Sequence, residues 1–181
     1  MEKVEVVVVG GGLAGLAAAC VLAEAGAEVL VVERGDYSGA KNVSGGRLYL
    51  EPVRPYLADL WDHAPFERFV VKERLTMMAP ESSLTVELDG GRLRREPPHS
   101  ATVLRATFDQ WLAEKAAERG ALVIPGYKVD DLLTAEGRVV GVRSADAEVQ
   151  ADVVVAADGV LSFVTEKAGL RGRLDPRRTA V

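Results

Sequence analysis

Residues 10–15, Gly10-Gly11-Gly12-Leu13-Ala14-Gly15, decide the fold that we expect for this chain. This G-x-G-x-x-G hexapeptide stands between the valine-rich residues 4–9, which have the pattern of a buried strand, and an apolar stretch with helical spacing. In this setting Gly10 permits a tight turn, Gly12 lets the backbone come close to a pyrophosphate, and Gly15 lets the helix pack on the sheet. The hexapeptide therefore predicts a strand–turn–helix whose first helical amides bind a phosphate.

A second predicted strand extends this interpretation. The helix should stop at Gly26, and residues 29–33 form another apolar run, so the segment has the size of one right-handed parallel βαβ unit. Glu33 ends that run, where it can accept hydrogen bonds from ribose hydroxyls and repel a 2′-phosphate. We therefore predict a dinucleotide site that disfavours an NADP-type adenosine. Taken alone, the hexapeptide would also suit a glycine-rich turn without a ligand.

Composition excludes several classes of protein. The chain has 181 residues, a net charge of −5 and no block rich in Lys or Arg, so nucleic-acid binding is not expected. Its single cysteine, Cys20, excludes an intrachain disulfide and a cysteine-ligated cluster or zinc site within the chain, which favours a cytoplasmic setting. Cys20 itself is expected to be a small core residue. Residues 6–23 are uncharged, but three glycines interrupt them, so no membrane span is expected.

The rest of the chain mixes the βαβ rhythm with antiparallel segments. Over 34–66 we expect a functional loop and then a short helix near 52–60. Strands should follow over 69–78 and 84–88, with a hairpin that joins 84–88 to 92–95 through Asp89-Gly90-Gly91. The remaining expected elements are a helix over 106–119 that stops at Gly120, a strand over 122–124, a β-meander over 127–133, 139–144 and 148–151, a strand over 153–157 and a helix over 161–168. Residues 169–181 show no core-forming pattern.

Residues 153–162, Val153-Val154-Val155-Ala156-Ala157-Asp158-Gly159-Val160-Leu161-Ser162, resemble the aspartate-glycine fingerprint of FAD-dependent enzymes of the glutathione-reductase type. The resemblance is strongest to their hydroxylase-like branch. In those enzymes this turn lies near the phosphate and ribityl region of the flavin, which implies FAD as the cofactor here. An Asp-Gly pair after a strand is in itself also an ordinary turn.

A more specific resemblance lies in Glu33-Arg34-Gly35-Asp36-Tyr37-Ser38-Gly39-Ala40-Lys41-Asn42-Val43-Ser44-Gly45-Gly46. This run is similar to the segment after the second strand in electron-transfer-flavoprotein:quinone oxidoreductases, above all in their nitrogen-fixation, FixC-like branch. Residues 104–112 resemble the Arg-x-x-Phe-Asp helix of that family, and residues 126–129 resemble the start of its meander. The resemblance implies that Arg105 lies beside the FAD, that Val129 meets the adenine through backbone atoms, and that Ser44, Gly45 and Gly46 approach the flavin ring.

The residues alone leave some of these roles open. Arg105 could hold a phosphate or carboxylate bidentately, or it could be a structural arginine. Lys41 and Asn42 could donate hydrogen bonds to the flavin, or they could belong to a plain surface loop.

Together these observations predict an α/β fold, a Rossmann-like FAD-binding domain of glutathione-reductase type whose parallel sheet carries a β-meander and an inserted antiparallel hairpin region. We expect the domain over 1–168, with incomplete substrate-side strands at about 66–100, and a tail over 169–181 that leads to a missing C-terminal half, since members of the family are more than twice this long. The predicted cofactor-binding residues are Gly10, Gly12, Leu13, Ala14, Gly15, Glu33, Arg34, Ser44, Gly45, Gly46, Arg105, Val129, Asp158 and Gly159. No catalytic side chain and no metal site are expected.

The implied function is that of an FAD-dependent oxidoreductase that passes electrons from an electron-transfer flavoprotein toward quinone or a ferredoxin-like protein. The resemblance implies a cytoplasmic protein, with peripheral contact at the inner face of the cell membrane through the missing part. Two alternatives stay open: a flavoenzyme like the geranylgeranyl reductases or aromatic hydroxylases, and a non-catalytic, truncated nucleotide-binding module.

Overall fold

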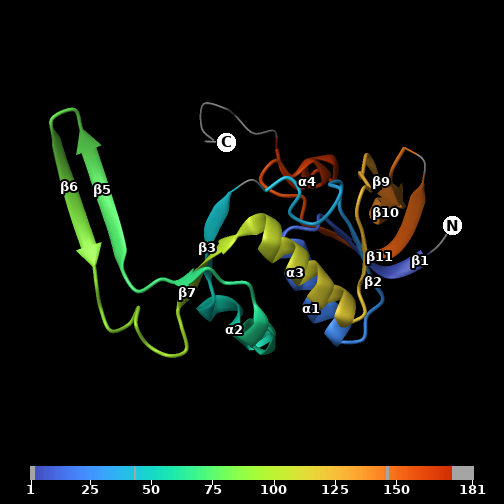
Figure 1. Ribbon diagram of the computed structural model, residues 1–181. Coiled ribbons are helices and arrows are strands. Elements are labelled where there is room, and N and C mark those ends of the chain that lie inside the picture. The colour runs from blue at the N-terminus through green and yellow to red at the C-terminus, as the bar shows by residue number, and fades with distance from the viewer. Residues whose placement is uncertain (1–2, 43, 146, 173–181) are drawn as a thin grey trace.

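The computed structural model describes residues 3–42, 44–145 and 147–172, and a six-stranded sheet is its main element (Figure 1). The strand order is β8-β2-β1-β11-β10-β9. The strands β8 (Leu122–Ile124), β2 (Val29–Val32), β1 (Lys3–Val9) and β11 (Glu148–Ala156) run parallel, whereas β10 (Arg138–Arg143) and β9 (Asp131–Ala135) continue the sheet antiparallel. The predicted α/β fold with a parallel sheet and a β-meander is confirmed.

Two helices, α1 (Leu13–Glu24) and α3 (Arg105–Glu118), lie side by side on one face of this sheet (Figure 1). Val6 and Val8 of β1 pack there against Leu16 of α1 and Phe108 of α3 in one buried cluster. Alternate residues of the same strand face the opposite side, and because both sides are covered, the strand needs apolar residues at nearly every position.

The opposite face of the parallel strands is covered by the meander and by α4 (Phe163–Lys167). Two expectations need correction here. The predicted strands over 148–151 and 153–157 are one strand, β11, and the first meander strand begins at Asp131 instead of residue 127. Residues 126 and 127 do not join that ladder because their amides donate to the carbonyl oxygens of Gly35 and Glu33.

A second, three-stranded sheet was not predicted. It consists of β3 (Gly45–Tyr49), β7 (Ser100–Leu104) and β4 (Arg68–Phe69), with β7 in the centre and antiparallel to both neighbours. Three short helical turns, η1 (Glu51–Val53), α2 (Arg54–Leu57) and η2 (Ala58–His63), follow β3 where a short helix was expected. The link from β7 directly into α3 joins this small sheet to the helical layer.

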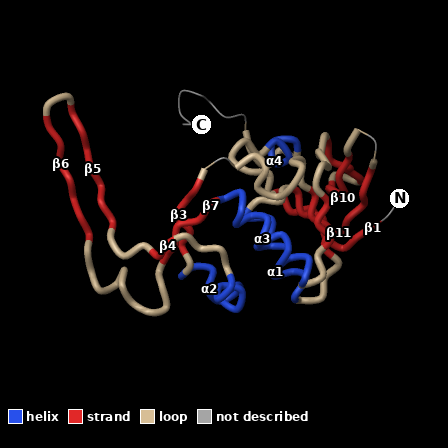
Figure 2. The backbone as a smooth tube through the Cα atoms, in the orientation of Figure 1, coloured by secondary structure: helices blue, strands red, loops and turns tan. Residues whose placement is uncertain are grey.

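The strands β5 (Glu73–Ala79) and β6 (Ser82–Leu88) form a two-stranded hairpin that extends away from the helices and the main sheet (Figure 2). The predicted pairing of 84–88 with 92–95 is therefore wrong. The strand β6 pairs backward with β5 through a turn at Pro80-Glu81, because the alternation of apolar side chains in β5 matches that in β6. Residues 91–93 form a turn, in which Leu93 is buried.

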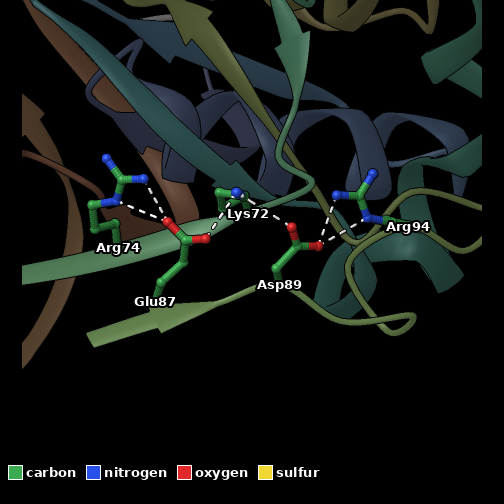
Figure 3. A network of polar contacts seen from close by, with 5 residues as sticks. All are labelled: Lys72, Arg74, Glu87, Asp89 and Arg94. Atoms are coloured by element: carbon green, nitrogen blue, oxygen red, sulfur yellow. Dashed lines mark hydrogen bonds and ion pairs between the residues drawn. The ribbon is translucent and has the colours of Figure 1, made fainter. Parts of the chain in front are cut away.

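The hairpin has two chemically different faces. Leu75 pairs with Val86 and Met77 with Leu84 on one face, and all four side chains are more than half exposed. On the other face, an ion-pair network runs from Arg74 through Glu87, Lys72 and Asp89 to Arg94 (Figure 3). Hydrogen bonds from Lys72 and Arg74 lower the pKa of Glu87. Such exposed pairs contribute little stability individually.

Two further observations complete the fold. No helix in the described ranges is both long enough and apolar enough to cross a membrane. Of the predicted tail over 169–181, residues 173–181 lie outside the part of the chain that the structure describes.

Candidate functional site: a dinucleotide cradle at the start of α1

The glycine loop connects β1 to α1 through two very close backbone approaches. Gly10 has a φ of +111°, and a Cβ on it would lie 2.3 Å from the carbonyl oxygen of Ala157. A Cβ on Gly15 would lie 2.0 Å from the carbonyl oxygen of Gly10 and 3.1 Å from Val8. The structure thus requires glycine at Gly10 for the tight turn and at Gly15 for the packing of the helix on the strand, as the sequence predicted.

Gly12 differs from these two glycines, because a Cβ on it would meet no atom within 4 Å. It is the N-cap of α1, in extended conformation, and no side chain caps this helix start. The first turn of α1, which includes Leu13 and Ala14, contains no acidic residue. Amides at a helix start lack intrahelical acceptors and carry the positive end of the helix dipole. An open space therefore borders amides that suit an anionic group such as a pyrophosphate.

Glu33 lies beside this loop at the end of β2. Its Oε2 accepts a hydrogen bond from the amide of Gly11 at 2.8 Å, and its Oε1 accepts one from the amide of Gly35 at 2.7 Å. These bonds fix the carboxylate against the loop, and each oxygen retains capacity for another donor. The sequence predicted the acceptor but not that two amides would orient it.

The Asp-Gly turn at the end of β11 meets the glycine loop. A Cβ on Gly10 would lie 3.3 Å from Cα of Asp158, so the two glycine-containing fingerprints, far apart in the sequence, are adjacent in space. The carboxylate of Asp158 accepts a hydrogen bond from the amide of Val164 at 2.8 Å and so caps the start of α4. Gly159 follows it at the carboxyl edge of the sheet.

The loop after β2 is anchored on the start of α3 by Asp109, the last residue of the Arg-x-x-Phe-Asp motif, for which no role was predicted. Both Nε and Nη2 of Arg105 donate to the fully buried carboxylate of Asp109 at 2.9 Å, and Nδ2 of Asn42 donates to it at 2.8 Å. Asn42 thus binds the protein itself. An acidic residue between Phe108 and Leu112 on the buried side of a predicted helix is the signal that could have identified Asp109.

The remaining predicted residues lie around these two centres. Ser44 accepts a hydrogen bond from the amide of Arg105 through its carbonyl oxygen, and Gly45 and Gly46 pair with the end of β7; all three are exposed. Residues 126 and 127 bond to Gly35 and Glu33, which brings the segment that leads to Val129 to the end of β2. Arg34 is exposed. The cradle thus unites Gly10, Gly12, Gly15, Glu33 and Asp158, whereas Arg105 and residues 44–46 form a neighbouring group.

Cys20 is a core residue, as expected. Its side chain is buried on α1, and burial raises the pKa of its thiol to about 11. It takes no part in the cradle.

The chain resembles known proteins over nearly its whole length. Residues 5–171 match the family described as FAD dependent oxidoreductase. Protein FixC of Escherichia coli K12 is 44% identical over 177 residues, and the probable electron transfer flavoprotein-quinone oxidoreductase YdiS of the same organism is 42% identical over 182 residues. The matches cover 98% and 99% of this chain but only 41% and 42% of those proteins, so the chain spans about two fifths of their length.

Among solved structures, a geranylgeranyl bacteriochlorophyll reductase-like protein from Thermoplasma acidophilum superposes with a TM-score of 0.79 at 28% identity, over 94% of this chain and 43% of that one. The halogenase CndH, described as a variant of FAD-dependent halogenases, superposes with a TM-score of 0.72 at 25% identity, over 92% of this chain and 40% of that one. These findings confirm the predicted family resemblance, the flavoprotein fold and FAD as the cofactor.

Proposed function

Because this chain belongs to the FAD-dependent oxidoreductase family, we propose that it is the FAD-binding part of an enzyme that accepts electrons from an electron-transfer flavoprotein and passes them to quinone or a ferredoxin-like protein. The observation that carries the proposal is the open cradle at Gly12, which Glu33 and the Asp158 turn border. The similarity to YdiS, a probable electron transfer flavoprotein-quinone oxidoreductase, supports this donor and acceptor.

In this proposal Gly10 and Gly15 shape the glycine loop, and the other predicted residues border the cofactor. The amides of Gly12, Leu13 and Ala14 bind the pyrophosphate, Glu33 accepts hydrogen bonds from the ribose hydroxyls, and Val129 and Arg34 border the adenosine. Arg105, Ser44, Gly45, Gly46, Asp158 and Gly159 lie toward the flavin end. Bound FAD supplies the redox chemistry, whereas these residues bind and orient it, so no side chain acts as a nucleophile or an acid.

The first experiment is a visible absorption spectrum of the purified protein after incubation with FAD and gel filtration. We expect retained flavin in the wild type and its loss in Gly12→Val, whose side chain fills the space at the helix start. Gly90→Val is the matched control, because a Cβ on Gly90 would also meet no atom within 4 Å. Gly90 lies in the segment after β6, far from Gly12 in the sequence. Flavin loss in both variants, or in neither, would refute the proposed location.

The second experiment tests the electron donor. Chemically reduced electron-transfer flavoprotein is mixed with the flavin-loaded protein, and oxidation of the donor is followed by absorbance. Electron transfer that depends on the bound flavin supports the proposal. A flavin-loaded protein that leaves the donor reduced contradicts it. A well-folded chain that retains no flavin would instead identify it as an incomplete nucleotide-binding module.

One observation favours a second candidate. The geranylgeranyl bacteriochlorophyll reductase-like structure shares 28% identity with this chain and superposes over nearly all of it. A reductase of this kind would pass electrons from the flavin to an isoprenoid double bond instead of to quinone. Turnover of a geranylgeranyl substrate with a chemical reductant, in the absence of electron-transfer flavoprotein, would favour this second function.

The proposed acceptor also sets an expected location. Quinones reside in the membrane, so a cytoplasmic protein that reduces one would work at the inner face of the cell membrane. Co-sedimentation of the intact protein with vesicles that contain quinone, compared with quinone-free vesicles, tests this expectation. Equal amounts of protein in both pellets would contradict quinone-dependent recruitment.

A further inference from the structure

Ser38 is a buried polar residue without a partner. Its side chain is 4% exposed, and its hydroxyl oxygen has no hydrogen-bond partner among the residues that the structure describes. A buried hydroxyl that makes no hydrogen bond destabilises a folded protein, and nearly all such groups in native proteins find a partner. The hydroxyl of Ser38 therefore requires an explanation.

The position of Ser38 relates this hydroxyl to the dinucleotide cradle. A Cβ on Gly11 would lie 2.7 Å from Oγ of Ser38 and 3.0 Å from Cβ of Glu33. The hydroxyl thus lies against the glycine loop on the side where the Glu33 carboxylate binds the amide of Gly11. No other part of the loop after β2 brings a buried side-chain hydroxyl to this place within the described residues.

The backbone of Ser38 is fixed from the other side. A Cβ on the following residue, Gly39, would lie 2.9 Å from Cβ of Asp109 and 3.1 Å from the backbone of Ala106. The loop therefore packs directly on the start of α3, where Asn42 is also bound. Ser38 is held between the cradle and this helix. Its hydroxyl changes direction by rotation about a single bond, Cα–Cβ, between staggered positions.

We propose that Ser38 is a further cofactor-binding residue, whose hydroxyl turns toward the cradle and forms a hydrogen bond with the adenosine half of FAD, at its ribose or pyrophosphate oxygens. The inference rests on the proposed location of the FAD site. A hydroxyl can donate to a phosphate oxygen and can both donate to and accept from a ribose hydroxyl. The ligand then satisfies a group that the protein alone leaves without a partner.

The test compares Ser38→Ala with wild type in the intact protein, in two measurements. We expect the dissociation constant for FAD to rise about three- to thirty-fold, which corresponds to one lost hydrogen bond. We also expect the melting temperature without FAD to stay unchanged or to rise, because the variant removes an unsatisfied buried group. A merely structural serine would not weaken binding while leaving the free protein equally stable.

Ser100→Ala is the matched control. Ser100 is also fully buried, but its hydroxyl already accepts a hydrogen bond from Nε of Arg47 at 3.0 Å, and it lies in β7 instead of the loop after β2. This variant should lower the melting temperature of the free protein and leave the dissociation constant for FAD unchanged. The pair of variants separates a binding hydroxyl from a structural one.

ADP and FMN locate the contact. Ser38→Ala should raise the dissociation constant for ADP by the same factor as that for FAD. The dissociation constant for FMN should not change. Three outcomes would each overturn the inference. These are an unchanged affinity for FAD, a loss of stability that parallels the loss of binding, and a weaker affinity for FAD with an unchanged affinity for ADP. If wild type binds FAD and Gly12→Val does not, such a result refutes the role of Ser38 alone and leaves the proposed FAD site standing.

Discussion

Asp109 and Arg105 stand one helical turn apart at the start of α3, and both Nε and Nη2 of Arg105 donate to the carboxylate of Asp109 at 2.9 Å. The carboxylate is fully buried, whereas the side chain of Arg105 is 26% exposed. The same carboxylate accepts a hydrogen bond from the side-chain amide of Asn42. One buried acid therefore fixes both the arginine that the family resemblance places beside FAD and the loop that leads to residues 44–46.

We expect Asp109→Asn to lower the free energy of unfolding by about 1.5–3 kcal/mol. In the wild type, Arg105 and Asn42 donate to two charged carboxylate oxygens, whereas the neutral amide of the variant offers them one acceptor oxygen. Urea unfolding without FAD measures this loss. Glu118→Gln is the control on the same helix, since Glu118 forms an exposed pair with Lys115, and should change stability by less than about 0.5 kcal/mol. Equal effects of the two substitutions would contradict the anchoring role of Asp109.

An alanine at Gly15 should mainly affect stability, whereas an alanine at Gly12 should mainly affect FAD binding. Gly15→Ala should lower the free energy of unfolding by about 1–3 kcal/mol or more, because its Cβ would overlap the carbonyl oxygen of Gly10. Gly12→Ala should lower the free energy of unfolding of the FAD-free protein by less than about 1 kcal/mol, the cost of alanine at an N-cap, and should weaken FAD binding. Thermal unfolding without ligand, followed by titration with FAD, measures both effects, and a strongly destabilised Gly12→Ala would be at odds with the open space beside it.

Glu33→Gln tests the oriented carboxylate. Only one oxygen remains as an acceptor, so either the amide of Gly11 or that of Gly35 loses its partner, and stability should fall by about 1–2 kcal/mol. The dissociation constant for FAD should rise as well. The control is Glu5→Gln, where an exposed carboxylate accepts the amide of Glu28 at 2.7 Å, and both quantities should stay close to those of wild type. An unaltered affinity in Glu33→Gln would exclude Glu33 from the ribose site.

Cys20 should contribute a pH-dependent term to stability. The folded protein holds the thiol protonated up to a pKa of about 11, above its ordinary value of 9.0, because burial disfavours the thiolate. The unfolded chain releases that proton near pH 9, so the free energy of unfolding should fall as the pH rises from about 9 through 11. Denaturant unfolding across this range should show a shallower fall in Cys20→Ala, and the wild-type thiol should react slowly with disulfide reagents at pH 8. Fast labelling of the native protein would contradict its burial.

The sequence predicted those parts of the site that depend on local patterns. The valine-rich strand, the glycine hexapeptide and the apolar face of α1 lie within 25 consecutive residues, so their spacing alone determines how they fold. The required close contacts at Gly10 and Gly15 follow directly from that spacing. Glu33 could be identified because the end of β2 has a fixed relation to the loop in a βαβ unit.

Other parts depend on pairings between distant residues and had no local signal. The strand β3 starts with two glycines and forms only because β7, more than 50 residues later, pairs with it. The turn-like Asp89-Gly90-Gly91 indicated a hairpin, but the competing alternation in β5 decided the partner of β6. No role was predicted for Asp109 or Ser38 for a related reason, since the importance of a buried polar side chain depends on which distant groups surround it.

The β5–β6 hairpin also has a consequence for how the molecule opens. In the part of the chain that the structure describes, no third strand joins β5 and β6. A two-stranded ribbon of this kind is held mainly by its own ladder and has little independent stability. Its amides should therefore exchange with deuterated solvent through local opening at low free energy, while those of β1 and β2 exchange only when the whole core unfolds. Cofactor binding at the glycine loop would slow exchange in the core strands and leave the ribbon unprotected, so the chain contains two units that respond differently to the same ligand.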